Sequence, residues 1–236
     1  MIKLTQISAE IKTNSYAVII AGGPGLSSLT VRSLDLLKRS LNLIYVDLQG
    51  TNGTEFVEGL TYEGLVFALK NELKTVIPDN AQVFTIGHSF GGYFASSLVD
   101  LDFARGVFCL ATPFSKESLV AAAENYNKKK TPDLAKAESQ WSTKKDTESF
   151  NKWLSEYGDM YFLLEKGREL LLNDKSSAEF FLSHRSDAGR LESLLGSLAA
   201  TRKLKVFIAA KQDGLLPEQQ LEDDARRGGF QFLSVD

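Results

Sequence analysis

The sequence of 236 residues has one cysteine, two histidines and no surplus of positive charge. A single cysteine excludes an internal disulfide. Because Cys109 lies in the apolar run 107–111, we expect a small buried hydrophobic residue in a reducing compartment rather than a nucleophile. Lys and Arg number 27 against 30 Asp and Glu, and this net charge of −3 disfavours nucleic-acid and anionic-lipid partners. Two separated histidines and one buried cysteine cannot assemble a metal site, so we expect no metal and no other cofactor.

Long hydrophobic stretches are also missing. Runs such as 16–21 and 206–210 are far shorter than the ~20 residues that cross a bilayer. The first residues lack the apolar segment and small-residue cleavage site of a signal peptide. We therefore expect a cytoplasmic protein that has no membrane partner. The sequence does not indicate an oligomeric state.

Short apolar runs that alternate with helical patterns indicate the fold class. The runs rich in Val, Ile, Phe and Tyr are 16–21, 43–48, 82–87, 106–111, 204–210 and 230–235. Continuous apolarity is typical of strands buried on both faces of a parallel sheet, and helix-period segments at 29–41 and 62–76 lie between them. We predict an α/β fold with a doubly wound, mostly parallel sheet, in which 2–11 forms a polar edge strand.

This alternation stops at Pro113. Between residues 115 and 201 the patterns predict only helices, at 116–127, 132–141, 147–157, 160–172 and 178–185. We therefore predict a core made of residues 1–114 and 202–236, with a helical cap over 115–201. The cap lysines, among them Lys128, Lys144 and Lys145, are interpreted as solvated helix faces rather than a polyanion site. Its many aromatic residues include Trp141, Phe150, Trp153, Tyr157, Phe180 and Phe181.

The most specific motif is Gly87-His88-Ser89-Phe90-Gly91, at the end of an apolar strand and before a helical segment at 93–99. This is the G-x-S-x-G pattern of a nucleophile elbow, in which a strained strand-to-helix turn exposes the serine hydroxyl. We expect positions 87 and 91 to require glycine, because larger side chains would collide across the turn. Ser89 is the predicted nucleophile, and the Phe90 backbone N–H is a candidate oxyanion donor.

A glycine-rich turn, Gly22-Gly23-Pro24-Gly25, directly follows the first buried strand. It matches no complete phosphate-binding pattern, and by itself it could be only a tight loop. Paired with the elbow, it predicts the second wall of an oxyanion hole, with the Gly23 N–H facing the Phe90 N–H.

A carboxylate, Asp213, follows the strand at 204–210. One interpretation is a turn aspartate before Gly214. The other, which we favour, is the acid that orients a catalytic histidine. In hydrolases whose nucleophile lies on such an elbow, the chain order is serine, acid, histidine.

These segments resemble the α/β-hydrolase superfamily, in particular the branch of proline iminopeptidases and related esterases. Residues 22–25, 87–92 and 213–217 are similar to that family's oxyanion loop, elbow and acid turn. The resemblance covers residues 16–111 and 204–235 and implies a serine hydrolase fold and mechanism. The sequence departs from the family at Ala21, where a histidine usually precedes the glycine turn.

The catalytic histidine is the largest departure. We expect His88 to point away from the Ser89 hydroxyl, and His184 precedes the acid and is expected to pack on the cap surface or within it. The family's histidine follows the last strand, which here is 230–235, and the sequence ends at Asp236. Either a histidine and a closing helix lie beyond this sequence, or the triad is unconventional. We expect the former, because a doubly wound sheet normally covers both faces of its last strand.

Together these observations predict a serine hydrolase that cleaves an ester or amide of a small, partly apolar substrate through an acyl-enzyme. It would be of the esterase or aminopeptidase type. The alternative is a catalytically inactive ligand-binding or interaction protein that uses the same fold.

Overall fold

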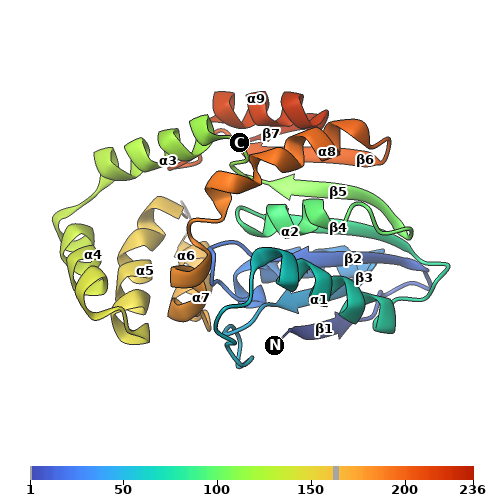
Figure 1. Cartoon of the computed structure of the whole chain (residues 1–236), viewed down its shortest axis with the longest axis horizontal. Helices are drawn as coiled ribbons and strands as arrows, with labels where there is room; N and C mark the ends of the chain where they lie inside the picture. Colours follow the sequence, from blue (N-terminus) through green and yellow to red (C-terminus); the bar gives the residue numbers. More distant parts are fainter. Residues whose placement is uncertain (1, 162–164) are drawn as a thin grey trace.

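A seven-stranded sheet forms the centre of the computed structural model, which describes residues 2–161 and 165–236 (Figure 1). In spatial order the strands are β1 (Lys3–Ile7), β3 (Asn42–Asp47), β2 (Ser15–Ile20), β4 (Gln82–His88), β5 (Ala104–Leu110), β6 (Leu204–Ala210) and β7 (Gln231–Val235). Only β1 is antiparallel to its neighbour. The predicted doubly wound, mostly parallel sheet is therefore confirmed.

The central strands are apolar throughout because both of their faces are covered. On β2, Val18 and Ile20 join one hydrophobic cluster, whereas Ala17 and Ile19 join a second cluster across the sheet. All four side chains are buried. Alternate residues of one strand thus supply the two cores, which is why the sequence shows a continuous apolar run.

Helices pack on both sides of the sheet. α1 (Tyr62–Val76) has the predicted bounds and buries Leu65, Leu69 and Leu73 at four-residue spacing. The helix predicted at 29–41 is instead a kinked 3₁₀ segment, η1 (Ser28–Arg39), with non-helical torsion angles at Val31. Further helices around the core are α2 (Gly91–Ser97), η2 (Ala188–Ser193), α8 (Leu194–Ala200) and α9 (Glu218–Gly228). The sequence patterns did not predict α8, α9 or η2.

In its described residues, the block between β5 and β6 consists of helices joined by short loops and contains no strand. Its helices are α3 (Lys116–Lys129), α4 (Pro132–Lys144), α5 (Thr147–Tyr161), α6 (Glu165–Leu172) and α7 (Ala178–His184), followed by η2 and α8. Of the helix predicted at 160–172, Met160 belongs to α5 and residues 162–164 lie outside the described residues. Helices α4 to α7 stand beside the carboxyl ends of the parallel strands (Figure 1).

Two polar contacts fasten this helical block to the core. The carboxylate of Asp174, between α6 and α7, accepts hydrogen bonds from the backbone N–H and the hydroxyl of Ser27. The Ser177 N–H donates to the carbonyl oxygen of Gly25 at 2.8 Å. Both core residues follow β2, so the block is held directly over the loop at the end of that strand.

The strand order reverses at β2. β3 pairs with one edge of β2, and β4 pairs with the other edge. In open α/β sheets, the loops at such a reversal diverge and leave a crevice in which ligands bind. The loop after β2 and the turn after β4 therefore flank the place where a site is expected.

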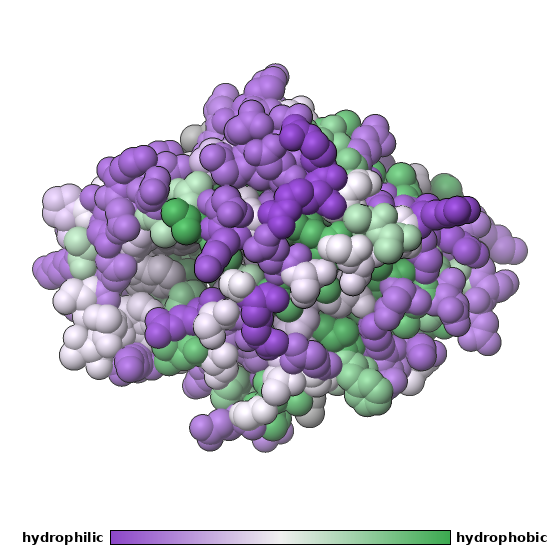
Figure 2. All heavy atoms as spheres, turned by 45° about the horizontal axis from the view of Figure 1, so that its top comes forward, coloured by the Kyte–Doolittle hydropathy of each residue, from purple (hydrophilic) through white to green (hydrophobic). Residues whose placement is uncertain are grey.

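Cys109 is buried and the surface is largely polar, as we expect from the sequence. Cys109 is buried on β5, and burial raises the pKa of its thiol to about 12. Polar and charged side chains cover most of the surface on the side of α3 and α9 (Figure 2). Lys128, Lys144 and Lys145 are exposed. Within the described ranges, no helix is both long enough and apolar enough to span a bilayer.

Candidate active site

Ser89 occupies the turn between β4 and α2 in a left-handed backbone conformation. Its φ is 49°, a value that non-glycine residues rarely adopt, and its N–H donates to the Leu110 carbonyl oxygen at 2.8 Å. This hydrogen bond anchors the turn to the neighbouring strand. A strained serine between a buried strand and a helix is the geometry of a nucleophile elbow.

Two glycines allow the close packing around this turn. A Cβ atom on Gly87 would lie 2.3 Å from the Gly91 carbonyl oxygen, and a Cβ on Gly91 would lie 2.3 Å from that of Ile20. Helix α2 therefore starts in contact with the backbone of β4 and β2. Any side chain larger than hydrogen would push these segments apart.

The glycine-rich turn after β2 contacts the elbow directly. A Cβ on Gly22 would approach the Cβ of Ser89 to 3.0 Å. Gly23 and Gly25 have φ of 116° and 92°, and the Gly23–Pro24 peptide bond is cis. Among the described residues, neither the Gly23 N–H nor the Phe90 N–H has a hydrogen-bond acceptor. Both donors are thus available to a ligand beside Ser89.

Asp213 lies after β6, and its carboxylate is held by the turn that follows. Its Oδ1 accepts hydrogen bonds from the N–H groups of Leu215 and Leu216 at 2.8 and 2.9 Å. These bonds use one carboxylate oxygen and fix the plane of the group. Asp213, Ser89 and Ala111 line one pocket of about 310 Å³, counting the part open to solvent.

His88, which we expect to point away from the Ser89 hydroxyl, is also among the residues that line this pocket. On β4, His88 lies on the same face of the sheet as Ile86, and it pairs in register with Leu110 of β5. Burial lowers the pKa of the His88 imidazole, an effect that the charge of Asp213 opposes, so the neutral ring is favoured at pH 7.

His184 is not among the residues that line this pocket. It is buried at the end of α7, where its Nδ1 lies 2.8 Å from Oδ2 of Asp187 and its ring packs 4.4 Å from that of Phe180. His184 thus packs among residues of the helical block, as we expect from the sequence. Within residues 2–161 and 165–236, His88 is thus the one histidine among the residues that line the pocket beside Ser89.

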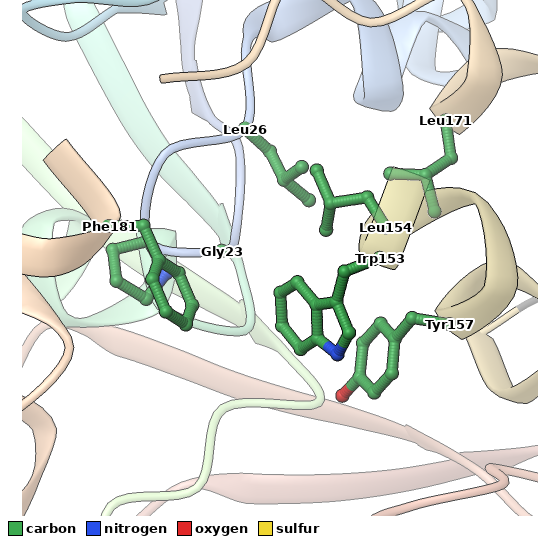
Figure 3. Close-up of a pocket in the computed structure, with 8 residues that line it drawn as sticks. Gly23, Leu26, Trp153, Leu154, Tyr157, Leu171 and Phe181 are labelled. Carbon is green, nitrogen blue, oxygen red and sulfur yellow. The ribbon is translucent and has the colours of Figure 1, made fainter. Parts of the chain in front are cut away.

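A second cavity, which we call the cap pocket, adjoins the other side of the glycine-rich turn. It encloses about 390 Å³, counting the part open to solvent, and its described lining is Gly23, Pro24, Leu26, Trp153, Leu154, Tyr157, Leu171 and Phe181. In Figure 3, Trp153 and Tyr157 form one wall of the hollow and Phe181 stands near Gly23 on the other. No sequence signal paired these aromatic residues with Gly23.

Comparisons with known proteins agree with this architecture. No protein-family model and no curated protein match the sequence. Solved structures do match, among them an esterase from Exiguobacterium antarcticum, at 15% identity over 100% of this chain and 87% of that chain, with a TM-score of 0.71. The chain has the α/β-hydrolase fold.

Two other solved structures extend the comparison. A proline iminopeptidase-related protein from Thermus thermophilus has a TM-score of 0.72 and 17% identity, over 99% of this chain and 84% of that chain. A thermophilic esterase from Thermogutta terrifontis has a TM-score of 0.66 and 16% identity, again over 99% and 84%. The structural resemblance therefore spans the whole described chain, including the helical block, and confirms the predicted fold class.

Proposed function

We propose that this protein is a serine hydrolase that cleaves an ester or amide of a small, partly apolar molecule. The observation that carries the proposal is the left-handed backbone of Ser89 at the turn between β4 and α2, beside a pocket that Asp213 also lines. Fold alone would not support an activity, since the same architecture serves many functions. The site geometry supplies the argument.

The proposed reaction begins with attack of the Ser89 hydroxyl oxygen on the substrate's carbonyl carbon. The N–H groups of Gly23 and Phe90 stabilise the negative charge that develops on the carbonyl oxygen. A base takes the serine proton and returns it to the leaving group, and water then hydrolyses the acyl-enzyme by the same steps. A serine nucleophile of this kind acts on acyl carbons, so the proposed substrate is an ester or an amide.

The base has to lie beside Ser89, in the pocket that Asp213 and His88 line. Asp213 is placed in this proposal as the carboxylate that orients an imidazole and stabilises its charged form. His88 is the imidazole beside it, but it adjoins Ser89 in the chain. Chemical rescue with imidazole added from solution tests whether His88 or another imidazole acts as the base.

The test is covalent labelling of the protein with a fluorophosphonate, followed by intact-mass measurement with and without added imidazole. We expect one adduct, absent in Ser89→Ala and retained in the exposed-serine control Ser139→Ala. Imidazole should accelerate labelling several-fold, and Asp213→Asn should slow ester hydrolysis by about 10²- to 10⁴-fold because the imidazolium loses its counter-charge. If His88 is the base, His88→Gln abolishes labelling and imidazole restores it.

Labelling that persists in Ser89→Ala would contradict the assignment of the nucleophile. If no adduct forms under any of these conditions, the hydrolase proposal fails and the pockets beside Ser89 belong to a ligand-binding protein. An unchanged circular-dichroism spectrum for each variant would exclude unfolding as the cause.

A further inference from the structure

We propose that Asn125 on α3 is a positioning residue that fixes the orientation of the Asp213 carboxylate. It acts through the peptide group between Leu215 and Leu216, which is hydrogen-bonded to both side chains. The inference rests on the proposed serine hydrolase activity and adds a residue of the helical block to that site. The block then takes part in arranging the acid, besides standing beside the strand ends.

The peptide group between Leu215 and Leu216 lies between the two side chains. On one side, Nδ2 of Asn125 donates a hydrogen bond to the Leu215 carbonyl oxygen at 2.9 Å. On the other side, the Leu216 N–H donates to Oδ1 of Asp213 at 2.9 Å. The carbonyl and the N–H of one trans peptide group point in opposite directions, so the two hydrogen bonds form a single chain from Asn125 to Asp213.

This chain of hydrogen bonds affects Asp213 in two ways. Because a peptide group is planar, a bond that holds its carbonyl oxygen also fixes the direction of its N–H. A donor at the carbonyl oxygen also polarises the peptide group and makes its N–H a stronger donor to the carboxylate. Oδ2 of Asp213 has no hydrogen-bond partner within residues 2–161 and 165–236, so its direction determines where it can hold an imidazole.

Asn125 lies at the contact between α3 and the acid turn, residues 213–216. Three residues earlier on the same face of α3, Ala122 packs against the hydrophobic cluster that contains Leu215 and Leu216. Asn125 is itself partly buried, and a polar group in such a contact costs free energy unless it is hydrogen-bonded. The Leu215 carbonyl oxygen supplies that partner. Since Leu215 and Leu216 are buried, water has little access to replace the bond.

A second helix of the block contacts the same turn. A Cβ on Gly214 would lie 2.3 Å from the carbonyl oxygen of Met160 on α5. Gly214 does not have a positive φ, so the close approach of α5, rather than the backbone conformation, requires glycine here. The acid turn is therefore held between β6 and two helices of the block, and Asn125 supplies the hydrogen bond that reaches Asp213.

The first test is Asn125→Leu, which keeps the approximate size of the side chain and removes the donor. We expect fluorophosphonate labelling of Ser89 and kcat for p-nitrophenyl acetate to fall about tenfold, the effect of one lost hydrogen bond. KM should change by less than about twofold, because Asn125 is not among the described residues that line the pocket beside Ser89. The control is Asn127→Leu, at an exposed position of the same helix, and it should change neither rate.

The same substitution in an Asp213→Asn background separates action through Asp213 from a general disturbance of the site. If Asn125 acts through that carboxylate, Asn125→Leu should slow labelling of the Asp213→Asn protein by less than about twofold. An equal loss in both backgrounds would show that the substitution disturbs the site as a whole, and would overturn the proposal. An unchanged labelling rate for Asn125→Leu alone would also overturn it.

Hydrogen exchange of the Leu216 amide gives a readout that needs no activity. Asn125→Leu should accelerate this exchange at least about threefold, whereas Asn127→Leu should not, because the Leu216 N–H loses its fixed direction toward Asp213. Labelling of the unmodified protein without either change in Asn125→Leu overturns the positioning role and retains the hydrolase. If the unmodified protein is not labelled at all, the hydrolase proposal fails and the positioning role fails with it, whatever the exchange rate.

Discussion

At the scale of single residues, Gly91 shows how much of the site depends on the absence of a side chain. A Cβ there would lie 2.3 Å from the Ile20 carbonyl oxygen and 2.4 Å from that of Ala21. Both are backbone atoms at the end of β2, so they cannot move without displacing the glycine-rich turn. Gly91 thus lets the start of α2 pack directly against the end of β2.

Substitution of Gly91 therefore has a large expected effect. We expect Gly91→Ala to lower the free energy of unfolding by about 1–3 kcal/mol, because overpacking displaces backbone. Gly196→Ala is the control: it lies inside α8 with no heavy atom within 4 Å of its added Cβ, and should raise stability by about 0.5–1 kcal/mol. Urea unfolding measures both, and equal effects of the two substitutions would contradict this account.

At the scale of elements, the segment between α6 and α7 is held to the core by a buried carboxylate. Burial, with a smaller contribution from the charge of Asp47, raises the pKa of Asp174 to about 6 even though hydrogen bonds from Ser27 act in the opposite direction. The same segment places the Ser177 carbonyl oxygen 2.5 Å from where a Cβ on Gly25 would lie. The position of α7, and with it Phe181, thus depends on this contact.

The raised pKa of Asp174 predicts a pH dependence of stability. Between about pH 4 and 6 the folded protein binds the Asp174 proton more tightly than the unfolded chain does, so this group's contribution is full below pH 4 and is lost as the pH rises through 6. The loss is at most about 3 kcal/mol, from a shift of roughly two pKa units.

Asp174→Asn stays neutral and should remove this loss. From pH 4 to pH 7, the stability of Asp174→Asn relative to the unmodified protein should therefore increase. Urea unfolding at each pH measures both free energies of unfolding. The exposed Asp102→Asn serves as the control and should give a difference that is nearly constant with pH. A constant difference for Asp174→Asn as well would contradict the role of its burial.

At the scale of the whole molecule, one face of β6 and β7 is notably apolar. Leu233 pairs in register with Ile208, which in turn pairs with Leu110, so these three side chains form a row across the sheet. Leu233 and Val235 are 42% and 47% exposed. Helix α9 contacts the same strands from the opposite face, where Leu221 and Ala225 join the cluster that contains Phe207. A contiguous apolar area of this kind promotes association.

Polar substitution on this face should reduce association of the isolated chain. We expect Val235→Thr combined with Leu233→Thr to lower the binding of an apolar fluorescent dye and the light scattering of concentrated samples. Val120→Thr is the control, because Val120 is 55% exposed on α3, away from this sheet face. An equal decrease for Val120→Thr would show that the effect is not specific to the face.

The sequence was sufficient to predict those features that depend on local chemistry. Continuous apolar runs predicted the parallel strands, because strands buried on both faces need no polar residues. The pattern around Ser89 predicted a strand, a sharp turn and a helix, since the two glycines and the serine are adjacent in the chain. Helix α9 was missed because its sequence, Glu218–Gly228, is mostly charged and presents only a narrow apolar stripe.

Tertiary structure decided which distant residues meet. Asp213, which the sequence favoured as the orienting acid over an ordinary turn, lies in a pocket with Ser89 only because β4, β5 and β6 are neighbours in the sheet. The orientation of His88 depends on the pairing of β4 with β5, and the cap pocket on contacts between Gly23 and side chains of α5, α6 and α7. Periodicity specifies which side of an element is apolar, whereas the packing of elements against each other determines what that side contacts.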